Sequence, residues 1–198
     1  MTRSARFHID IDGWIAPARH VPSPNFNTRP VDTRISLLVI HSISLPPGKF
    51  GGPCIDAFFT NTLDAAAHPY FQTIADMKVS SHLLIRRDGS VVQYVPFTQR
   101  AWHAGVSQFQ GTECNNYSIG IELEGCDEHG YDAAQYRVLA AITKLLQKTY
   151  PGITGERIAG HCDIAPQRKT DPGPHFDWER YRKAIKPKAT RARGKIIG

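Results

Sequence analysis

Apolar residues along this chain occur in short runs and strict alternations, the pattern of β-strands that alternate with helices. Residues 36–40 form an apolar run that leads directly into His41, which predicts a buried strand with a polar residue at its end. Residues 118–124, SIGIELE, alternate, so their apolar residues face one side of a strand while Glu122 and Glu124 share the other. Residues 82–87 and 91–95 flank Asp88-Gly89, which predicts a β-hairpin closed by a type I′ turn.

The longest helical pattern spans residues 132–150. Asp132 can cap its start with Gln135 reaching back, and Pro151-Gly152 ends it. One apolar stripe follows this helix: Val138, Leu139, Ile142, Leu145 and Leu146. Shorter helices are expected over 54–62, 70–77 and 178–186, and loops rich in Gly or Pro over 45–53 and 163–177. This mixture predicts an α/β (α+β) fold, a central mixed β-sheet flanked by helices.

Composition supports one globular domain. The 198 residues are 41% hydrophobic and 21% charged, and they contain no repeat and no long linker. The net charge of +6 is concentrated at the end: residues 180–198 carry eight basic and no acidic side chains, so the rest of the chain has a net charge of −2. We expect a single domain over 1–186 and a basic C-terminal tail over 187–198. Because no aromatic residue follows Tyr181, a solvated tail is favoured over one that binds nucleic acid or membrane.

The cysteines and the N-terminus bear on the compartment. Four cysteines occur without a CxxC pair, and the first residues, MTRSARFHIDIDGW, contain no apolar secretory segment. No stretch approaches the length of a membrane span. We therefore expect a cytoplasmic protein with free thiols, and a monomer is the simplest expectation for its assembly.

Three separated side chains are candidate ligands of a metal ion. His41 closes an apolar strand, and His161 opens the segment GHCDIAPQRKTDPGP, in which Asp171 follows ten residues later. Zinc hydrolases commonly take three such donors and leave a fourth position for water. On spacing alone, a hydrogen-bonded structural role for a histidine beside a strand is the more common case.

Four motifs strengthen that prediction through a resemblance. The segments IHSIS (40–44), RAWHAG (100–105), SIGIELEG (118–125) and GHCDIAPQRKTDPGP (160–174) resemble, in this order, the type 2 N-acetylmuramoyl-L-alanine amidase superfamily. The resemblance runs from about Trp14 to Trp178, and within the superfamily it is to cytoplasmic amidases that act on 1,6-anhydro-muropeptides. It implies a peptidoglycan-recognition-like fold, a role in cell-wall recycling, and in some bacteria a lowering of the muropeptide signal that induces β-lactamase.

The resemblance also assigns roles. It implies Zn²⁺ held by His41, His161 and Asp171, with Glu122 and Lys169 as catalytic residues. Glu122 can carry the water proton to the departing amine, and Lys169 can stabilise the developing oxyanion. Lys169 lies two residues before Asp171, so in an extended loop both side chains point the same way.

For some of these residues, the sequence leaves alternative roles open. From the residues alone, Glu124 competes with Glu122, and the resemblance selects Glu122. Positions matching Lys78 and Trp102 bind the peptide and sugar parts of the substrate in the resembling family, but an exposed lysine and a half-buried core tryptophan are the ordinary alternatives. His103 is interpreted as structural.

Two positions differ from the residues that are common in the resembling amidases, and two other functions are alternatives to amidase activity on anhydro-muropeptides. Ser42 stands where asparagine is common, and Glu113 stands where a basic residue often holds substrate carboxylates, which bears on substrate preference. A non-catalytic peptidoglycan-binding module is one alternative, although the ligand set is complete. A phage-type or exported amidase acting on intact peptidoglycan is the other.

Overall fold

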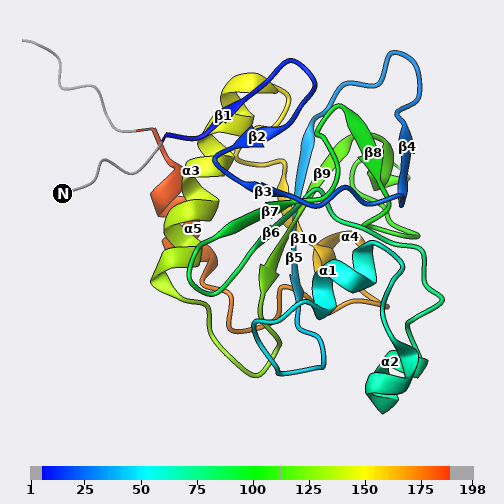
Figure 1. The fold of residues 1–198 in the computed structure, drawn as a ribbon. Helices are drawn as coiled ribbons and strands as arrows, with labels where there is room; N and C mark the ends of the chain where they lie inside the picture. The colour runs from blue at the N-terminus through cyan, green and yellow to red at the C-terminus, as the bar shows by residue number, and fades with distance from the viewer. Residues whose placement is uncertain (1–5, 112, 188–198) are drawn as a thin grey trace, which may run out of the picture.

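A six-stranded mixed β-sheet forms the centre of the protein (Figure 1). The computed structural model describes residues 6–111 and 113–187. The parallel part of the sheet comprises four strands, in spatial order β10 (Ile158–Gly160), β5 (Leu37–Ile43), β9 (Ser118–Glu124) and β6 (Leu83–Ile85). The antiparallel strand β7 (Val91–Gln93) and then β3 (Arg19–His20) complete the sheet. Two small sheets flank it: β1 (His8–Ile9) with β2 (Ile15–Ala16), and β4 (Phe26–Thr28) with β8 (Gln99–Ala101).

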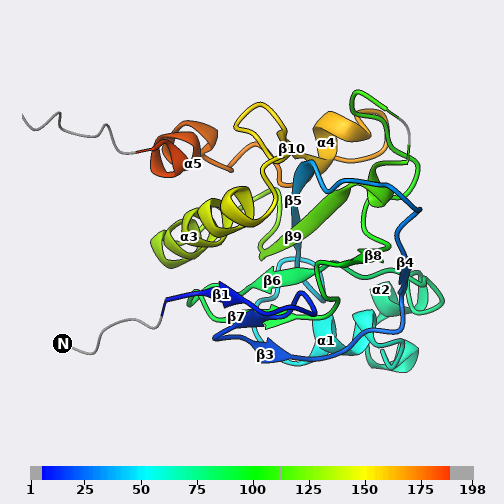
Figure 2. The same ribbon diagram turned by 90° about the horizontal axis from the view of Figure 1, so that it is seen from above.

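Helices cover both faces of this sheet (Figure 2). The long helix α3 (Ala133–Thr149) and the C-terminal helix α5 (Trp178–Ile185) lie together on one face, whereas α1 (Cys54–Phe59) lies on the other. The remaining helical segments are short: η1 (Ala65–Ala67), α2 (Pro69–Gln72), η2 (Cys114–Asn116) and α4 (His161–Ile164). The predicted central mixed sheet flanked by helices is confirmed.

Strand β5 separates two parts of the core. Leu38 and Ile40 pack in the large apolar cluster with α3 and α5, and Leu37 and Val39 pack in a smaller cluster on the opposite face. Because side chains alternate along a strand, His41 lies on the face of Leu37 and Val39, away from α3. The strand continues for two residues beyond His41, to Ile43, so His41 is not at its end as predicted, but its imidazole lies on the face that α3 leaves free.

The predicted helices and strands form, with shorter bounds in most cases. Strand β9 has the predicted limits, and the backbone N–H of Asp132 donates to Gln135 Oε1 over 3.0 Å at the start of α3, as the capping pattern indicates. The helix predicted over 54–62 ends at Phe59, and the one predicted over 70–77 is reduced to α2 and the turns that follow it.

The type I′ turn was a wrong prediction, although the hairpin of β6 and β7 is present. Gly89, with φ of 87°, is the one residue of this described turn with positive φ, and its N–H donates to the carbonyl oxygen of Arg86 over 2.9 Å. The Asp88 carboxylate accepts the N–H of Ser90 over 2.8 Å, a local bond that holds Asp88 in an ordinary conformation. The loop therefore has three residues, a turn followed by a left-handed glycine.

Other predictions fall partly outside the described residues. The basic tail predicted over 187–198 lies there apart from Pro187. All four cysteines are described, and each carries a free thiol as predicted. Within the described ranges, none of the helices has the length and apolar character needed to cross a membrane.

Candidate metal centre and cleft

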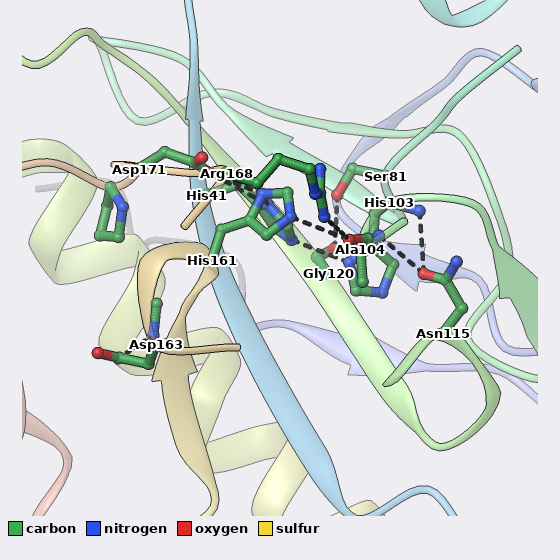
Figure 3. A network of polar contacts seen from close by, with 12 residues as sticks. His41, Ser81, His103, Ala104, Asn115, Gly120, His161, Asp163, Arg168 and Asp171 are labelled. Carbon is green, nitrogen blue, oxygen red and sulfur yellow. Dashed lines mark hydrogen bonds and ion pairs between the residues drawn. The ribbon is translucent and has the colours of Figure 1, made fainter. Parts of the chain in front are cut away.

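The two histidines and the aspartate predicted as ligands converge on one point (Figure 3). His41 Nδ1 lies 2.9 Å from His161 Nδ1, and Asp171 Oδ2 lies 3.2 Å from the first and 3.1 Å from the second of these nitrogens. Zinc bonds of about 2.0–2.2 Å to nitrogen and oxygen imply about 3.3–3.6 Å between neighbouring ligand atoms of a tetrahedron. The three donors therefore match one face of a zinc tetrahedron to within a few tenths of an ångström, and their chemistry fits this metal.

Sheet topology brings these donors together. Ile40 pairs with Gly160 in parallel strands, so His41 and His161 follow at the same carboxyl edge of the sheet. Asp171 returns to this edge because the backbone N–H of Cys162 donates to its carbonyl oxygen over 2.8 Å. The nine residues between His161 and Asp171 thus form a loop that is closed by a backbone hydrogen bond beside the site.

The far nitrogen of each imidazole is also held. His161 Nε2 lies 3.1 Å from the carbonyl oxygen of Ala104, and His41 Nε2 lies 2.9 Å from His103 Nδ1. A carbonyl oxygen can only accept, so His161 carries its proton on Nε2 and presents a free Nδ1 lone pair to the centre. The same tautomer at His41 makes His103 the acceptor, and His103 Nε2 then donates to Ser118 Oγ over 3.0 Å.

His103 was expected to be structural, and the sequence analysis missed its contact with a candidate ligand. Its ring occupies the space beside Gly120, where an added Cβ would lie 2.5 Å from the ring carbon Cγ. The motif RAWHAG contains the available signal, because His103 and Ala104, whose carbonyl holds His161, are adjacent in it. One short segment therefore orients both imidazoles.

The two glutamates of β9 have different surroundings. Glu124, 1% exposed, pairs with Arg86 at 3.2 Å and accepts the backbone N–H of Gly51 over 2.6 Å. Glu122, 8% exposed, pairs in register with His41, and in the described part of the chain its Oε2 has no hydrogen-bond partner. Glu124 fastens the loop 45–53 to the sheet, whereas Glu122 faces the metal centre with an unpaired oxygen.

Burial and charge set the protonation of this centre. Burial, reinforced by the negative charge of Asp171, raises the pKa of Glu122 well above its usual value, and the charge of Lys169 opposes this rise. Burial also lowers the pKa of His41 to about 4. Burial alone would raise the pKa of Asp171, but its close contacts with the imidazoles of His161 and His41 outweigh burial and hold that pKa far below its usual range. His41 and Asp171 are therefore in the unprotonated forms that bind metals at neutral pH.

One open cavity of about 1640 Å³ adjoins the metal centre, and we call it the cleft. Every site residue predicted from the sequence lines it: His41, Lys78, Trp102, Glu122, His161, Lys169 and Asp171. Trp102 is held by its indole N–H, which donates to Asn27 Oδ1 over 2.8 Å. Lys169, Thr170 and Asp171 all line this cavity, and Ser42 and Glu113 line it as well.

Comparison with known proteins agrees with this arrangement. The family model described as N-acetylmuramoyl-L-alanine amidase matches residues 31–174. The chain is 62% identical over 177 residues to the 1,6-anhydro-N-acetylmuramyl-L-alanine amidase AmpD of Citrobacter freundii, a match that covers 89% of this chain and 94% of that protein.

Solved structures of amidases also superpose on this chain. A crystal structure of a Se-Met AmpD derivative superposes with a TM-score of 0.87 at 60% identity, covering 90% of this chain and 99% of that one. A complex of the E. coli amidase AmiD with anhydro-N-acetylmuramic acid-L-Ala-D-γ-Glu-L-Lys superposes with a TM-score of 0.56 at 29% identity, covering 89% of this chain and 65% of that one.

Proposed function

The chain belongs to the N-acetylmuramoyl-L-alanine amidase family, and from this membership we propose that it hydrolyses the amide bond between 1,6-anhydro-N-acetylmuramic acid and L-alanine in muropeptides. The single observation that carries the proposal is the convergence of two imidazoles and a carboxylate beside Glu122, on the wall of one cleft. The names of the relatives supply the bond and the anhydro sugar.

Zn²⁺ is the proposed cofactor, held by His41, His161 and Asp171. With three protein ligands, zinc supplies a water nucleophile at neutral pH and polarises the carbonyl that is attacked. The candidate ligand atoms lie 2.9–3.2 Å apart, and each imidazole is held through its other nitrogen. Such a set of donors keeps a fourth position for the substrate side of the cleft.

Glu122 is the proposed proton carrier. Its buried carboxyl group has a raised pKa and an unpaired oxygen, the two properties needed to accept a proton from water and pass it to the departing amine. Lys169 is proposed to stabilise the negative oxygen of the tetrahedral intermediate, because its ammonium group lines the cleft and acts electrostatically on both Glu122 and His41.

Lys78 and Trp102 are the proposed substrate contacts. Trp102 lines the cleft with its indole N–H held by Asn27, and an aromatic ring there is suited to a sugar ring. An exposed ammonium group at Lys78 suits a carboxylate of the stem peptide. Glu113 lines the cleft with a negative charge, so the preference among stem peptides is expected to differ from that of relatives with a basic residue there.

A direct assay tests the reaction and its metal. The protein is incubated with a soluble anhydro-muropeptide before and after complete chelation, and products are identified by mass spectrometry. Release of free stem peptide that stops on chelation and returns with zinc is expected. Tight binding of the muropeptide without cleavage would instead indicate a peptidoglycan-binding module, and full turnover after metal removal would contradict the zinc mechanism.

The proposed reaction takes place in the cytoplasm, on soluble fragments of the cell wall. A role in cell-wall recycling, in the cytoplasm, and in lowering the β-lactamase-inducing signal requires preference for soluble fragments. Comparing rates on soluble anhydro-fragments and on intact sacculi distinguishes this role from that of a phage-type or exported amidase. Faster hydrolysis of the fragments is expected, and comparable release from sacculi would favour the alternative.

A further inference from the structure

A second group of metal-binding side chains lies on the turn that follows β9. Cys126, Glu128 and His129 each offer a ligand atom, and the three atoms lie within 4.8 Å of one another. The turn is tight: Cys126 and His129 form an isolated antiparallel bridge, and Cys126 Sγ lies 3.2 Å from His129 Nδ1. We call these three residues the turn cluster. It shares no residue with the metal centre described above.

The geometry and chemistry of the turn cluster suit a borderline-soft divalent cation. Zinc bonds of about 2.3 Å to sulfur and 2.0–2.1 Å to nitrogen imply a separation of about 3.6 Å between two such ligands, close to the separation found. A thiolate, an imidazole and a carboxylate are all zinc ligands. Glu128 and His129 are exposed and Cys126 is half-buried, so an ion can reach the cluster and water can complete its coordination.

Neighbouring residues hold the turn and join it to the cleft. The His129 ring packs edge-on against Phe50, with ring centroids 6.1 Å apart. Asp127 lies against Gly173, where an added Cβ would meet its carboxylate oxygen at 2.4 Å, and Gly173 is two residues beyond Asp171. Cys126 and Glu128 themselves line the cleft. The turn is thus part of the cleft wall and directly contacts the loop that carries a ligand of the metal centre.

We infer that Cys126, Glu128 and His129 form a second site for Zn²⁺ at the edge of the cleft, and that an ion bound there hinders substrate entry. The first part depends only on the side chains of the turn. The second part rests on the proposed amidase activity, so the two parts need separate measurements.

Cobalt substitution tests the first part without any substrate. The three ligands of the metal centre contain no sulfur, so a thiolate-to-cobalt charge-transfer band can arise only from a cysteine elsewhere. Titration of the metal-free protein with Co²⁺ is expected to give this band after the first equivalent. Cys126→Ser and His129→Asn should abolish or shift it, while the matched control Cys54→Ser, which removes another half-buried thiol, should retain it.

Two results would overturn the site: absence of the band in the parent protein, or a band that survives Cys126→Ser but disappears in Cys162→Ser. Zinc content provides a second readout, with two equivalents expected in the parent protein and one in Cys126→Ser. An equal zinc content in these two proteins would also overturn the site.

The effect on the cleft is measured through the rate of muropeptide hydrolysis. Zinc added beyond the first equivalent should lower the rate several-fold in the parent protein and leave Cys126→Ser unaffected. Equal inhibition of both proteins would overturn the hindrance while leaving the cobalt result intact. Absence of hydrolysis in the parent protein with one equivalent of zinc would instead refute the proposed function.

Discussion

Gly120→Ala is the substitution that most directly tests how the metal centre is held. Gly120 lies on β9 beneath the ring of His103, and a Cβ placed there would lie 2.5 Å from Cγ and 2.6 Å from Nδ1 of that ring. Ordinary van der Waals contact begins near 3.4 Å, so the ring or the strand must move by about 0.9 Å. His103 is buried between His41 and Ser118, and it therefore cannot move without altering those contacts.

The expected loss of zinc affinity follows from the hydrogen bond between His41 and His103, which this shift would lengthen. The His41 Nε2 to His103 Nδ1 distance of 2.9 Å would grow to about 3.8 Å if the ring moved directly away, which is beyond hydrogen-bond range. Loss of a partner behind a metal ligand typically costs about 10- to 100-fold in metal affinity. Overpacking itself costs about 1–3 kcal/mol of folding stability. We expect a folded but less stable protein whose zinc dissociation constant rises by that factor.

The assay is competition for zinc with a chromophoric chelator, with circular dichroism to confirm folding. Gly152→Ala is a matched control, because a Cβ there would also be crowded, 2.9 Å from the carbonyl oxygen of Ile35, but away from the metal centre. This control should lose stability and keep its zinc affinity. A folded Gly120→Ala protein with the parent affinity for zinc would refute the argument that His103 orients His41.

Three further predictions follow from the same centre. Glu122→Gln should lower kcat by about 10²- to 10⁴-fold while zinc content, measured by atomic absorption, is unchanged; a loss of zinc would show that Glu122 acts through the metal site instead. Lys169→Met should lower kcat by about 10²- to 10³-fold with little change in KM, measured by steady-state kinetics, and an effect confined to KM would contradict its role at the oxyanion. The third prediction concerns the metal-free protein. Because the pKa of Glu122 is raised, the folded state keeps a proton on this carboxyl group that the unfolded state releases above a pH of about 4.5. The free energy of unfolding should therefore fall as the pH rises from about 4.5 through the folded-state pKa. Urea unfolding at several pH values should show a smaller fall in Glu122→Gln, and identical pH profiles would contradict the assignment.

The features that the sequence predicted well are encoded locally. The alternation in residues 118–124 sets the limits of β9, and the apolar run before His41 predicts β5, because side-chain periodicity and strand geometry share a period of two. The start of α3 is also encoded locally, because the capping residues Asp132 and Gln135 are only three residues apart in the sequence.

The features that the sequence did not predict depend on contacts between distant segments. The roles of Glu122 and Glu124 separate only when Arg86 and Gly51 fold against one of them. His103 is 62 residues from His41, and no local pattern indicates that their nitrogens meet. The hairpin turn was mispredicted because a side-chain hydrogen bond of Asp88 favours a longer loop than the Asp-Gly pair alone suggests.

Strand β9 shows why fold and chemistry depend on the same residues here. Ser118, Gly120 and Glu122 share one face: the first accepts a hydrogen bond from His103, the second leaves room for its ring, and the third faces the metal centre. The alternate residues of the strand lie in the apolar core beneath α3. A shift of one residue in the pairing of β5 with β9 would place Glu122 in that core and an apolar side chain beside the ligands. The hydrophobic effect that sets the register of β9 therefore also sets which residue faces His41, so the position of the acid is specified as strongly as the core itself.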